Sequence, residues 1–350
     1  MLSYEVVEWG GPLQASQSET PNPVGTEVLL KVKCCGVCHS DVHIRDGYFD
    51  LGGGRKFMMG ERGMKLPLTM GHETYGTIVA AGPDAGTVPI GAERIAYPWI
   101  GCGTCARCRE GNDNLCSNMK SIGIQRPGGY ADHVIVPHPR YLVDAQGVDP
   151  AFAATLACSG ITTYGAISKL KPFAAEDWIA VLGAGGLGLL CVSVLRAMGH
   201  QNIASVDIDP AKFAAARAAG AAETLDGKDA GTLKKLLEIS GGNVYGALDF
   251  VGSNDTAKLG VAVLRKGGRY VVSGLFGGEL PLSMVQVAQR AITVQGNYVG
   301  NVQDLKDMVA LAKSGKLKPI PIEKRPMAEV DRALSELKAG KIVGRVVVEA

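Results

Sequence analysis

The chain has 350 residues, of which 46% are hydrophobic and 20% are charged, and its 36 Lys and Arg residues nearly balance its 34 Asp and Glu residues. At ~150 residues per domain this length allows about two domains, and the composition excludes disordered and collagen-like chains. A net charge of +2 is too balanced for a protein that binds mainly the phosphate backbone of nucleic acids, so we expect small molecules as partners and no nucleic acid.

The first 150 or so residues predict a mostly β domain. No Lys or Arg precedes Lys31 and no apolar stretch opens the chain, so a signal peptide is not expected and the protein is predicted to be cytoplasmic. Short β-branched segments separated by Gly and Pro indicate an antiparallel, barrel-like arrangement. The predicted strands are residues 28–33, 77–81, 94–98 and 132–137.

Four of the nine cysteines are clustered in one C-x2-C-x2-C-x7-C segment. They are Cys102, Cys105, Cys108 and Cys116. In a chain without an export signal, thiols or metal ligands are expected rather than disulfides. Four thiolates can hold a zinc ion at ~2.3 Å per bond, whereas a ferredoxin-type iron–sulfur run, the competing interpretation, places its fourth Cys three residues on. We predict a structural zinc site with no open position for chemistry.

From residue 178 the pattern becomes an alternation of strands and helices, which is typical of a doubly wound parallel sheet. Strands are predicted at 178–182, 202–206, 245–250 and 269–273, and helices at 187–198 and 210–219. Residues 178–195 lack charge over the length of a membrane span, but their glycine cluster predicts a turn instead, so no membrane segment is expected. A helix at 302–314 and a strand at 344–348, which could rejoin the first domain, complete the chain.

The turn after the first of these strands reads Gly183-Ala-Gly185-Gly186-Leu187-Gly188 and matches the G-x-G-x-x-G pattern of dinucleotide-binding loops. Its glycines would let backbone N–H groups and the helix dipole approach a pyrophosphate. Asp207 ends the next predicted strand and would accept hydrogen bonds from the adenosine ribose. Because Asp209 follows without an adjacent Arg, NAD is expected rather than NADP. The alternative is a glycine turn that binds no nucleotide.

Two further segments carry potential metal ligands: Cys35-Gly-Val-Cys38-His39-Ser40-Asp41-Val-His43 and Gly71-His72-Glu73. Taken alone, Cys35 and Cys38 could form a redox dithiol or be buried structural cysteines. A thioredoxin-like fold, which a redox dithiol would need, is not indicated.

Five motifs, in this order, resemble those of the zinc-dependent medium-chain alcohol dehydrogenases over essentially the whole chain. They are G-V-C-H-S-D-V-H at 36–43, G-H-E at 71–73, the four-cysteine loop, L-A-C-S-G-I-T-T-Y at 156–164 and V-L-G-A-G-G-L-G at 181–188. The resemblance implies an α/β protein with a mostly β, GroES-like catalytic domain at residues 1–155 and 296–350. A Rossmann domain that binds NAD is implied at residues 156–295.

The resemblance also implies a catalytic zinc with one open coordination position. Its protein ligands would be Cys38, His72 and Cys158. Glu73 would be an occasional alternative ligand, and Asp41 would orient the imidazole of His72. Ser40 and His43 would pass the proton of the alcohol to the surface. With the four-cysteine loop, two zinc ions per chain are expected.

Further contacts with NAD are implied by the same resemblance: His39 and Arg345 at the pyrophosphate, Lys212 beside the adenosine ribose and Thr162 near the nicotinamide. For the substrate channel, the matching segments are residues 97–100 and 273–276. Trp99 and Leu275 are therefore expected as apolar walls that favour medium-length or aromatic alcohols over ethanol. Trp99 could instead be an ordinary packing residue.

Residues 50–64 lengthen the usual spacing between Cys38 and His72. Three consecutive glycines and several apolar side chains in this insertion suggest a mobile lid over the substrate channel or a subunit contact, with a tolerated surface insertion as the alternative. Similar lengthening occurs in tetrameric archaeal members of the family, so a homo-oligomer, tetramer or dimer, is expected.

The predicted function is the reversible oxidation of primary or secondary alcohols to aldehydes or ketones, with hydride transfer to NAD. Two alternatives remain open. The chain could be a polyol dehydrogenase of the same superfamily, or a structural or sensory protein that binds the nicotinamide cofactor and zinc without turnover.

Overall fold

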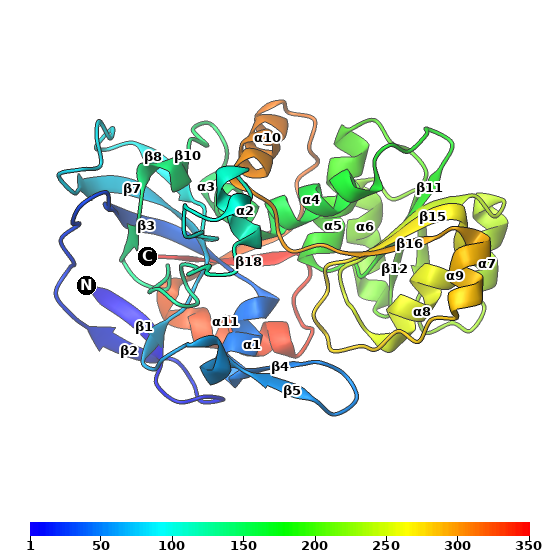
Figure 1. Cartoon of the computed structure of the whole chain (residues 1–350), viewed down its shortest axis with the longest axis horizontal. Helices are drawn as coiled ribbons and strands as arrows, with labels where there is room; N and C mark the ends of the chain where they lie inside the picture. The colour runs from blue at the N-terminus through cyan, green and yellow to red at the C-terminus, as the bar shows by residue number, and fades with distance from the viewer.

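Two large β-sheets, one in each of two lobes, organise the protein (Figure 1). A computed structural model describes residues 1–350, apart from the side chain of Arg62. Both ends of the chain lie in the lobe that carries the first sheet, and the second sheet forms the other lobe.

The first lobe is built on a seven-stranded sheet in the order β10-β8-β7-β3-β18-β17, with β9 also paired to β3. These strands are β3 (Val28–Val37), β7 (Glu73–Ala81), β8 (Glu93–Ala96), β9 (His133–Val136), β10 (Leu142–Val143), β17 (Ile322–Pro326) and β18 (Arg345–Glu349). The smaller strands are β1 (Leu2–Val6), β2 (Gln14–Gln17) and β6 (Leu68–Thr69), which pair together, and β4 (Tyr48–Asp50) and β5 (Lys56–Met58), which form a hairpin. The last strand, β18, pairs antiparallel with β3, so the predicted return to the first lobe is confirmed.

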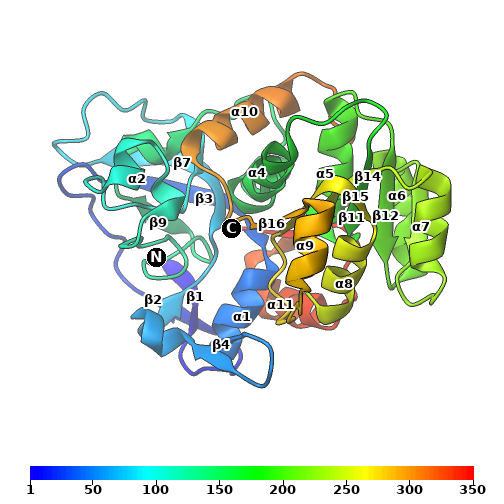
Figure 2. The ribbon, with the colours of Figure 1, turned by 45° about the vertical axis from the view of Figure 1, so that its right-hand side comes forward.

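The second lobe is a six-stranded parallel sheet in the order β13-β12-β11-β14-β15-β16. Its strands are β11 (Trp178–Leu182), β12 (Ile203–Asp207), β13 (Glu223–Asp226), β14 (Val244–Asp249), β15 (Leu264–Val272) and β16 (Thr293–Gly296). Figure 2 shows helices on both faces of this sheet, with α8 and α9 in front. This is the doubly wound Rossmann order, so the predicted fold class is confirmed.

Helices connect the strands and cover the sheets. They are α1 (His39–Asp46), α2 (Ala106–Arg109), α3 (Pro150–Thr155), α4 (Ile161–Leu170), α5 (Gly186–Ala197), α6 (Phe213–Ala219), α7 (Thr232–Ser240), α8 (Asn254–Ala262), α9 (Met284–Arg290), α10 (Val302–Lys313) and α11 (Val330–Lys338). A π-helical turn, η4 (Leu156–Gly160), joins α3 to α4. One hydrophobic cluster runs from the strands of the first lobe through these joined helices into α5, so the lobes share a core.

One local prediction differs from the structure. The helix predicted at 210–219 begins as a 3-10 turn, Pro210–Lys212, because the Asp209 side chain accepts a hydrogen bond from the N–H of Ala211, and α6 follows it. The insertion forms the β4–β5 hairpin followed by a 3-10 turn, Met59–Arg62. Its three consecutive glycines, residues 52–54, all have positive φ and make the hairpin turn.

The uncharged segment at 178–195 consists of β11, the glycine turn and most of α5, as predicted. Within the described part of the chain, no helix combines the length and the apolar character needed to cross a membrane.

Candidate active site

Four potential metal ligands from distant segments meet where the chain passes from the first lobe to the second. Cys38 is the N-cap of α1, His72 lies just before β7, Glu73 is the first residue of β7, and Cys158 lies in the π-helical turn η4. Their ligand atoms lie within 4.8 Å of one another, and all four residues are buried. We call these residues the buried ligand group. The π-helical turn that places Cys158 had no signal in the sequence, although such turns are frequent at functional sites.

The carboxylate of Asp41, which is fully buried, holds two of these segments together. Its Oδ1 lies 3.0 Å from Nδ1 of His72, and its Oδ2 accepts hydrogen bonds from the N–H of Cys38 at 3.0 Å and the hydroxyl of Tyr130 at 2.9 Å. When Nδ1 donates to Asp41, the neutral imidazole carries a free lone pair on Nε2. Tyr130 was not predicted, because a single Tyr outside any motif gives no signal.

The donor set of the buried ligand group fits a zinc ion. Nε2 of His72 is buried and has no hydrogen-bond partner among the described residues. The Sγ atoms of Cys38 and Cys158 lie 4.0 Å apart, close to the ~3.8 Å expected for two thiolates on one tetrahedral zinc. The hydrogen bond with Cys158, together with His72, holds the pKa of the Cys38 thiol well below its usual range in spite of burial. The thiolate is the form that binds metal.

Arg345 connects the buried ligand group to the dinucleotide-type loop. Its guanidinium forms a buried ion pair with Oε2 of Glu73, while Oε1 of Glu73 has no partner in the part of the chain that is described. Burial raises the pKa of Glu73 to about 7, against the effect of the Arg345 charge. A Cβ added to Gly186 would lie 2.2 Å from Cδ of Arg345. Arg345 therefore touches both features, and only glycine fits opposite it.

Three predicted site residues lie on α1 directly after Cys38. His39, Ser40 and His43 are half-buried, and the imidazole rings of His39 and His43 lie 5.4 Å apart. Phe276, from the loop after β15, lies 5.8 Å from the ring of His39, so the second lobe closes over this part of the helix. Ser40 and His43 are three positions apart and share one helix face.

The glycine loop has the predicted strand–turn–helix context. It follows β11 and leads into α5, whose N-cap is Gly185. Gly183 has a φ of +93°, and a Cβ on Gly188 would lie 1.7 Å from the carbonyl oxygen of Gly183. Both positions therefore require glycine. Leu187 follows Gly186 in the first turn of α5, and its carbonyl accepts a hydrogen bond from the Thr163 hydroxyl.

Asp207 lies at the carboxyl end of β12 beside this loop. Its Oδ2 accepts a hydrogen bond from the N–H of Ala184 at 2.6 Å, and Lys212 lies 3.3 Å from its Oδ1. Thr162 is on α4, where its hydroxyl is buried and unpaired with respect to the described residues. Of the predicted cofactor-contact residues, Asp207 and Arg345 thus contact the glycine loop directly, and Lys212 lies beside Asp207.

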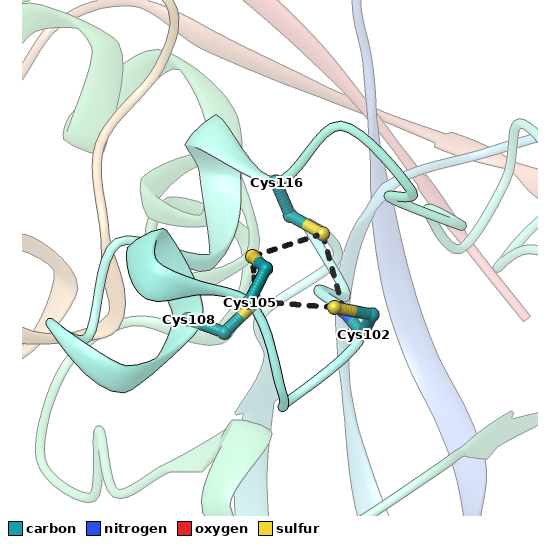
Figure 3. Close-up of side chains that lie close together, drawn as sticks. All are labelled: Cys102, Cys105, Cys108 and Cys116. Carbon is teal, nitrogen blue, oxygen red and sulfur yellow. Dashed lines mark hydrogen bonds between the residues drawn. The ribbon is translucent and has the colours of Figure 1, made fainter.

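The four-cysteine loop forms a second, separate cluster (Figure 3). Its sulfur atoms point toward one another, with Sγ separations of 3.5 Å between Cys105 and Cys108, 3.8 Å between Cys105 and Cys116, and 4.0 Å between Cys102 and Cys108. The N–H groups of Cys102 and Asn118 donate to Sγ of Cys116. These separations suit four thiolates on one tetrahedral ion.

The two residues predicted to line the substrate channel lie in different surroundings. Trp99 is 3% exposed, its ring lies 5.6 Å from that of His72, and its Nε1–H donates to the carbonyl of Ala157 at 3.2 Å. Leu275 is half exposed and lines an open cavity of about 620 Å³ together with Leu115 and Tyr298. The Tyr298 ring lies 5.7 Å from that of Trp99. Tyr298 was missed because it follows an edge strand and belongs to none of the motifs.

Comparison with known proteins agrees with this arrangement. Residues 25–146 match the alcohol dehydrogenase GroES-like domain, and residues 186–314 match the zinc-binding dehydrogenase domain. An NAD-dependent alcohol dehydrogenase of Sulfurisphaera tokodaii is 34% identical, with 99% of each chain covered. A D-arabinose 1-dehydrogenase (NADP(+)) of Saccharolobus solfataricus is 33% identical, with 96% of this chain and 94% of the relative covered.

Among solved structures, the alcohol dehydrogenase of the archaeon Aeropyrum pernix superposes with a TM-score of 0.90 at 28% identity, and both chains are fully covered. The two domain matches cover most of the chain, and the relatives match it over nearly its whole length. The chain therefore belongs to the zinc-dependent medium-chain alcohol dehydrogenase family.

Proposed function

We propose that the protein catalyses the reversible oxidation of primary or secondary alcohols to aldehydes or ketones with NAD. One observation carries this proposal. Arg345 contacts both Glu73 of the buried ligand group and Gly186 of the dinucleotide loop, so a metal and a dinucleotide would be held side by side. A zinc ion bound there would supply a Lewis acid that makes an alcohol hydroxyl more acidic. NAD, when bound, would accept the hydride.

The protein's own residues would prepare this reaction. Asp41 fixes the His72 ring so that Nε2 faces Cys38 and Cys158, and the buried Trp99 excludes water beside that ring. The hydroxyl of Ser40 would take the proton of the alcohol, and His43 would receive it one helical turn later. Burial, together with the neighbouring His39, lowers the pKa of His43, so its imidazole is neutral and able to accept a proton near neutral pH.

We further propose that NAD is preferred over NADP. The carboxylate of Asp207 lies beside the glycine loop, where it would accept hydrogen bonds from ribose hydroxyls and repel a 2′-phosphate. Lys212 would lie beside the same ribose, and His39 and Arg345 would contact the pyrophosphate. Thr162 would contact the nicotinamide. This assignment makes residues 156–295 the cofactor domain and residues 1–155 and 296–350 the catalytic domain.

Two zinc ions per chain are proposed, one in the buried ligand group and one in the four-cysteine loop. The mixed donor set of Cys38, His72 and Cys158 leaves a fourth position for substrate, whereas four thiolates close the second site. Glu73 would serve as an alternative ligand through Oε1. Zinc analysis of the purified protein should give about two ions per chain.

Medium-length or aromatic alcohols are the proposed substrates, because Trp99 offers an apolar wall beside His72 and Leu275 lines the open cavity that Tyr298 borders. The test is a panel of ethanol, longer alcohols, benzyl alcohol, secondary alcohols, polyols and aldoses with NAD and with NADP, followed at the absorbance band of the reduced cofactor. Preference for polyols or aldoses would assign the protein to that branch of the superfamily. The absence of turnover with every compound would support the structural or sensory alternative.

We also propose a homo-oligomer. The edge strand β16 is exposed along its whole length, and Met284, Val285 and Val294 on this side of the second lobe are large exposed apolar residues. An edge strand with apolar neighbours can pair with a second copy. Light scattering coupled to size-exclusion chromatography should give a mass of two or four chains, and a monomer would contradict this assignment.

A further inference from the structure

The four-cysteine loop is hydrogen-bonded to residues 297–301, which follow β16 and which we call the wall segment. Nδ2 of Asn114 donates to the carbonyl of Tyr298 at 3.0 Å. Nδ2 of Asn301 donates to Oδ1 of Asn112 at 3.0 Å. A loop whose cysteines would hold a structural ion is thus attached directly to the border of the cavity described above.

The wall segment is fixed from other sides as well. The Tyr97 hydroxyl donates to the carbonyl of Gly300 at 2.8 Å, and Nδ2 of Asn297 donates to the carbonyl of Thr162 at 2.9 Å. Between them, Val299 has a φ of +45° and is only 8% exposed. A buried β-branched residue in the left-handed region is strained, and such strain persists only where the surroundings hold it. The backbone turns here because its neighbours fix it.

This turn places the Tyr298 ring against Trp99, which in turn contacts the buried ligand group. The ring packs edge-on against Trp99 at 5.7 Å, and Trp99 packs at 5.6 Å against His72. The Trp99 indole also donates to the carbonyl of Ala157, the neighbour of Cys158. A contact path therefore runs from Asn114 through Tyr298 and Trp99 to His72, one of the proposed zinc ligands, and to Ala157, which precedes another.

We propose that Asn114 is a positioning residue that sets the substrate preference of the enzyme by holding Tyr298 against Trp99. This inference rests on the proposed function. Asn114 is 8% exposed, and its Oδ1 has no partner among the residues described. A buried amide that is only half satisfied is costly. Nδ2 of Asn114 donates to Tyr298 and not to its own loop, so the interaction with the wall segment offsets this cost.

The test is Asn114→Ala in the zinc-loaded enzyme, with Ser117→Ala as the matched control. Ser117 is exposed on the same loop. Release of Tyr298 should raise kcat/KM for a bulky secondary alcohol relative to ethanol by about five-fold or more, mainly through KM, because one hydrogen bond is worth about that factor. Zinc content should stay at the wild-type value in both variants. Ser117→Ala should leave the substrate ratio unchanged.

A double-mutant cycle separates positioning from general loosening of the loop. In a Tyr298→Ala background, Asn114→Ala should change the substrate ratio no further, because the ring that it positions is already gone. Equal effects in both backgrounds would overturn the proposal. If Asn114→Ala does not fold, Asn112→Ala removes the second bond to the wall segment and should shift the ratio in the same direction.

The inference and the proposed function fail in different ways. A wild-type enzyme that reduces NAD with alcohols, but whose substrate ratio is indifferent to both Asn variants, overturns only the positioning role. A zinc-loaded wild type with no turnover overturns the proposed function, and the positioning role with it.

Discussion

The two cysteine-containing groups of this protein are held in opposite ways. The four-cysteine loop collects its donors within one short segment, and each of its sulfurs lies within 4.0 Å of at least one other. The buried ligand group collects donors from three segments, and Cys38 and Cys158 are 120 positions apart. The first group depends on a local turn, whereas the second exists only when the whole fold is formed. We therefore expect the four-cysteine loop to affect mainly the stability of the fold and the buried ligand group to affect mainly the reaction.

The largest expected effects test this separation directly. Cys38→Ser should lower turnover by ~10³-fold or more while the protein still folds, because the proposed catalytic zinc loses one of its ligands. Cys105→Ser should lower the melting temperature by ~10 °C, because a structural zinc contributes to folding free energy. Activity assays and thermal melts on both variants measure this. If Cys105→Ser lost turnover without loss of stability, the separation would be wrong.

The next prediction concerns the contact between Asp41 on α1 and His72 of the buried ligand group. Asp41→Asn keeps the size of the side chain but removes the carboxylate that fixes Nδ1 of His72, so zinc affinity or activity should fall by about 10- to 100-fold. Competition with a zinc chelator measures the affinity. Tyr130→Phe is the matched control. It removes only the hydroxyl that donates to Asp41 and should cost about 1 kcal/mol of stability. If Tyr130→Phe lowered zinc affinity as much as Asp41→Asn does, the carboxylate of Asp41 would have no specific role in fixing His72.

A third prediction tests the side that faces the cofactor. Asp207→Ser should lower the preference for NAD over NADP by about 10- to 100-fold, because it removes the acceptor for ribose hydroxyls and the repulsion of a 2′-phosphate. The ratio of kcat/KM for the two cofactors measures this change. Asp209→Ser is the control, since the Asp209 side chain instead caps the turn at Pro210. An unchanged ratio in Asp207→Ser would transfer the role to Asp209 or another residue.

The smallest expected effect concerns His43 on α1, which would pass the proton of the alcohol to the surface. Burial lowers the pKa of His43, so the neutral ring should persist below the usual pKa of about 6.5 and the relay should fail only as the pH falls further. His43→Gln should lower kcat at neutral pH by about 10-fold and flatten the acid limb of the pH profile. Steady-state kinetics from pH 5 to 9 test this. A pH profile with the wild-type shape would remove His43 from the relay.

The comparison also explains which features could be predicted from the sequence. The spacing of Cys102, Cys105, Cys108 and Cys116 predicted their cluster, because so short a loop leaves few other arrangements. The donors Cys38, His72 and Cys158 could be grouped only through the family resemblance, since their approach depends on β3, β7 and η4 packing together. The alternation of strands and helices likewise predicted the second lobe.

Single hydrogen bonds between distant segments could not be found in advance. Tyr130, which lies outside every motif, donates to Asp41, and Asn114, a non-cysteine residue of the four-cysteine loop, donates to Tyr298. Neither periodicity nor spacing indicates such contacts. The insertion was expected to be a mobile lid or subunit contact. In the structure it is a hairpin whose Arg55 lies 3.0 Å from Glu279 of the second lobe, and the lid remains a prediction.

The position of β18 has a consequence for synthesis on the ribosome. This strand pairs with the part of β3 that leads directly into Cys38, and it begins with Arg345. Because β18 follows every strand of the second lobe in the chain, the first lobe cannot complete its sheet until the second lobe has been synthesised, and this part of β3 lacks its β18 partner until then. The second lobe is contiguous and can fold earlier. We therefore expect the second lobe to finish folding before the first, against the usual order of folding during translation, in which the N-terminal part folds first.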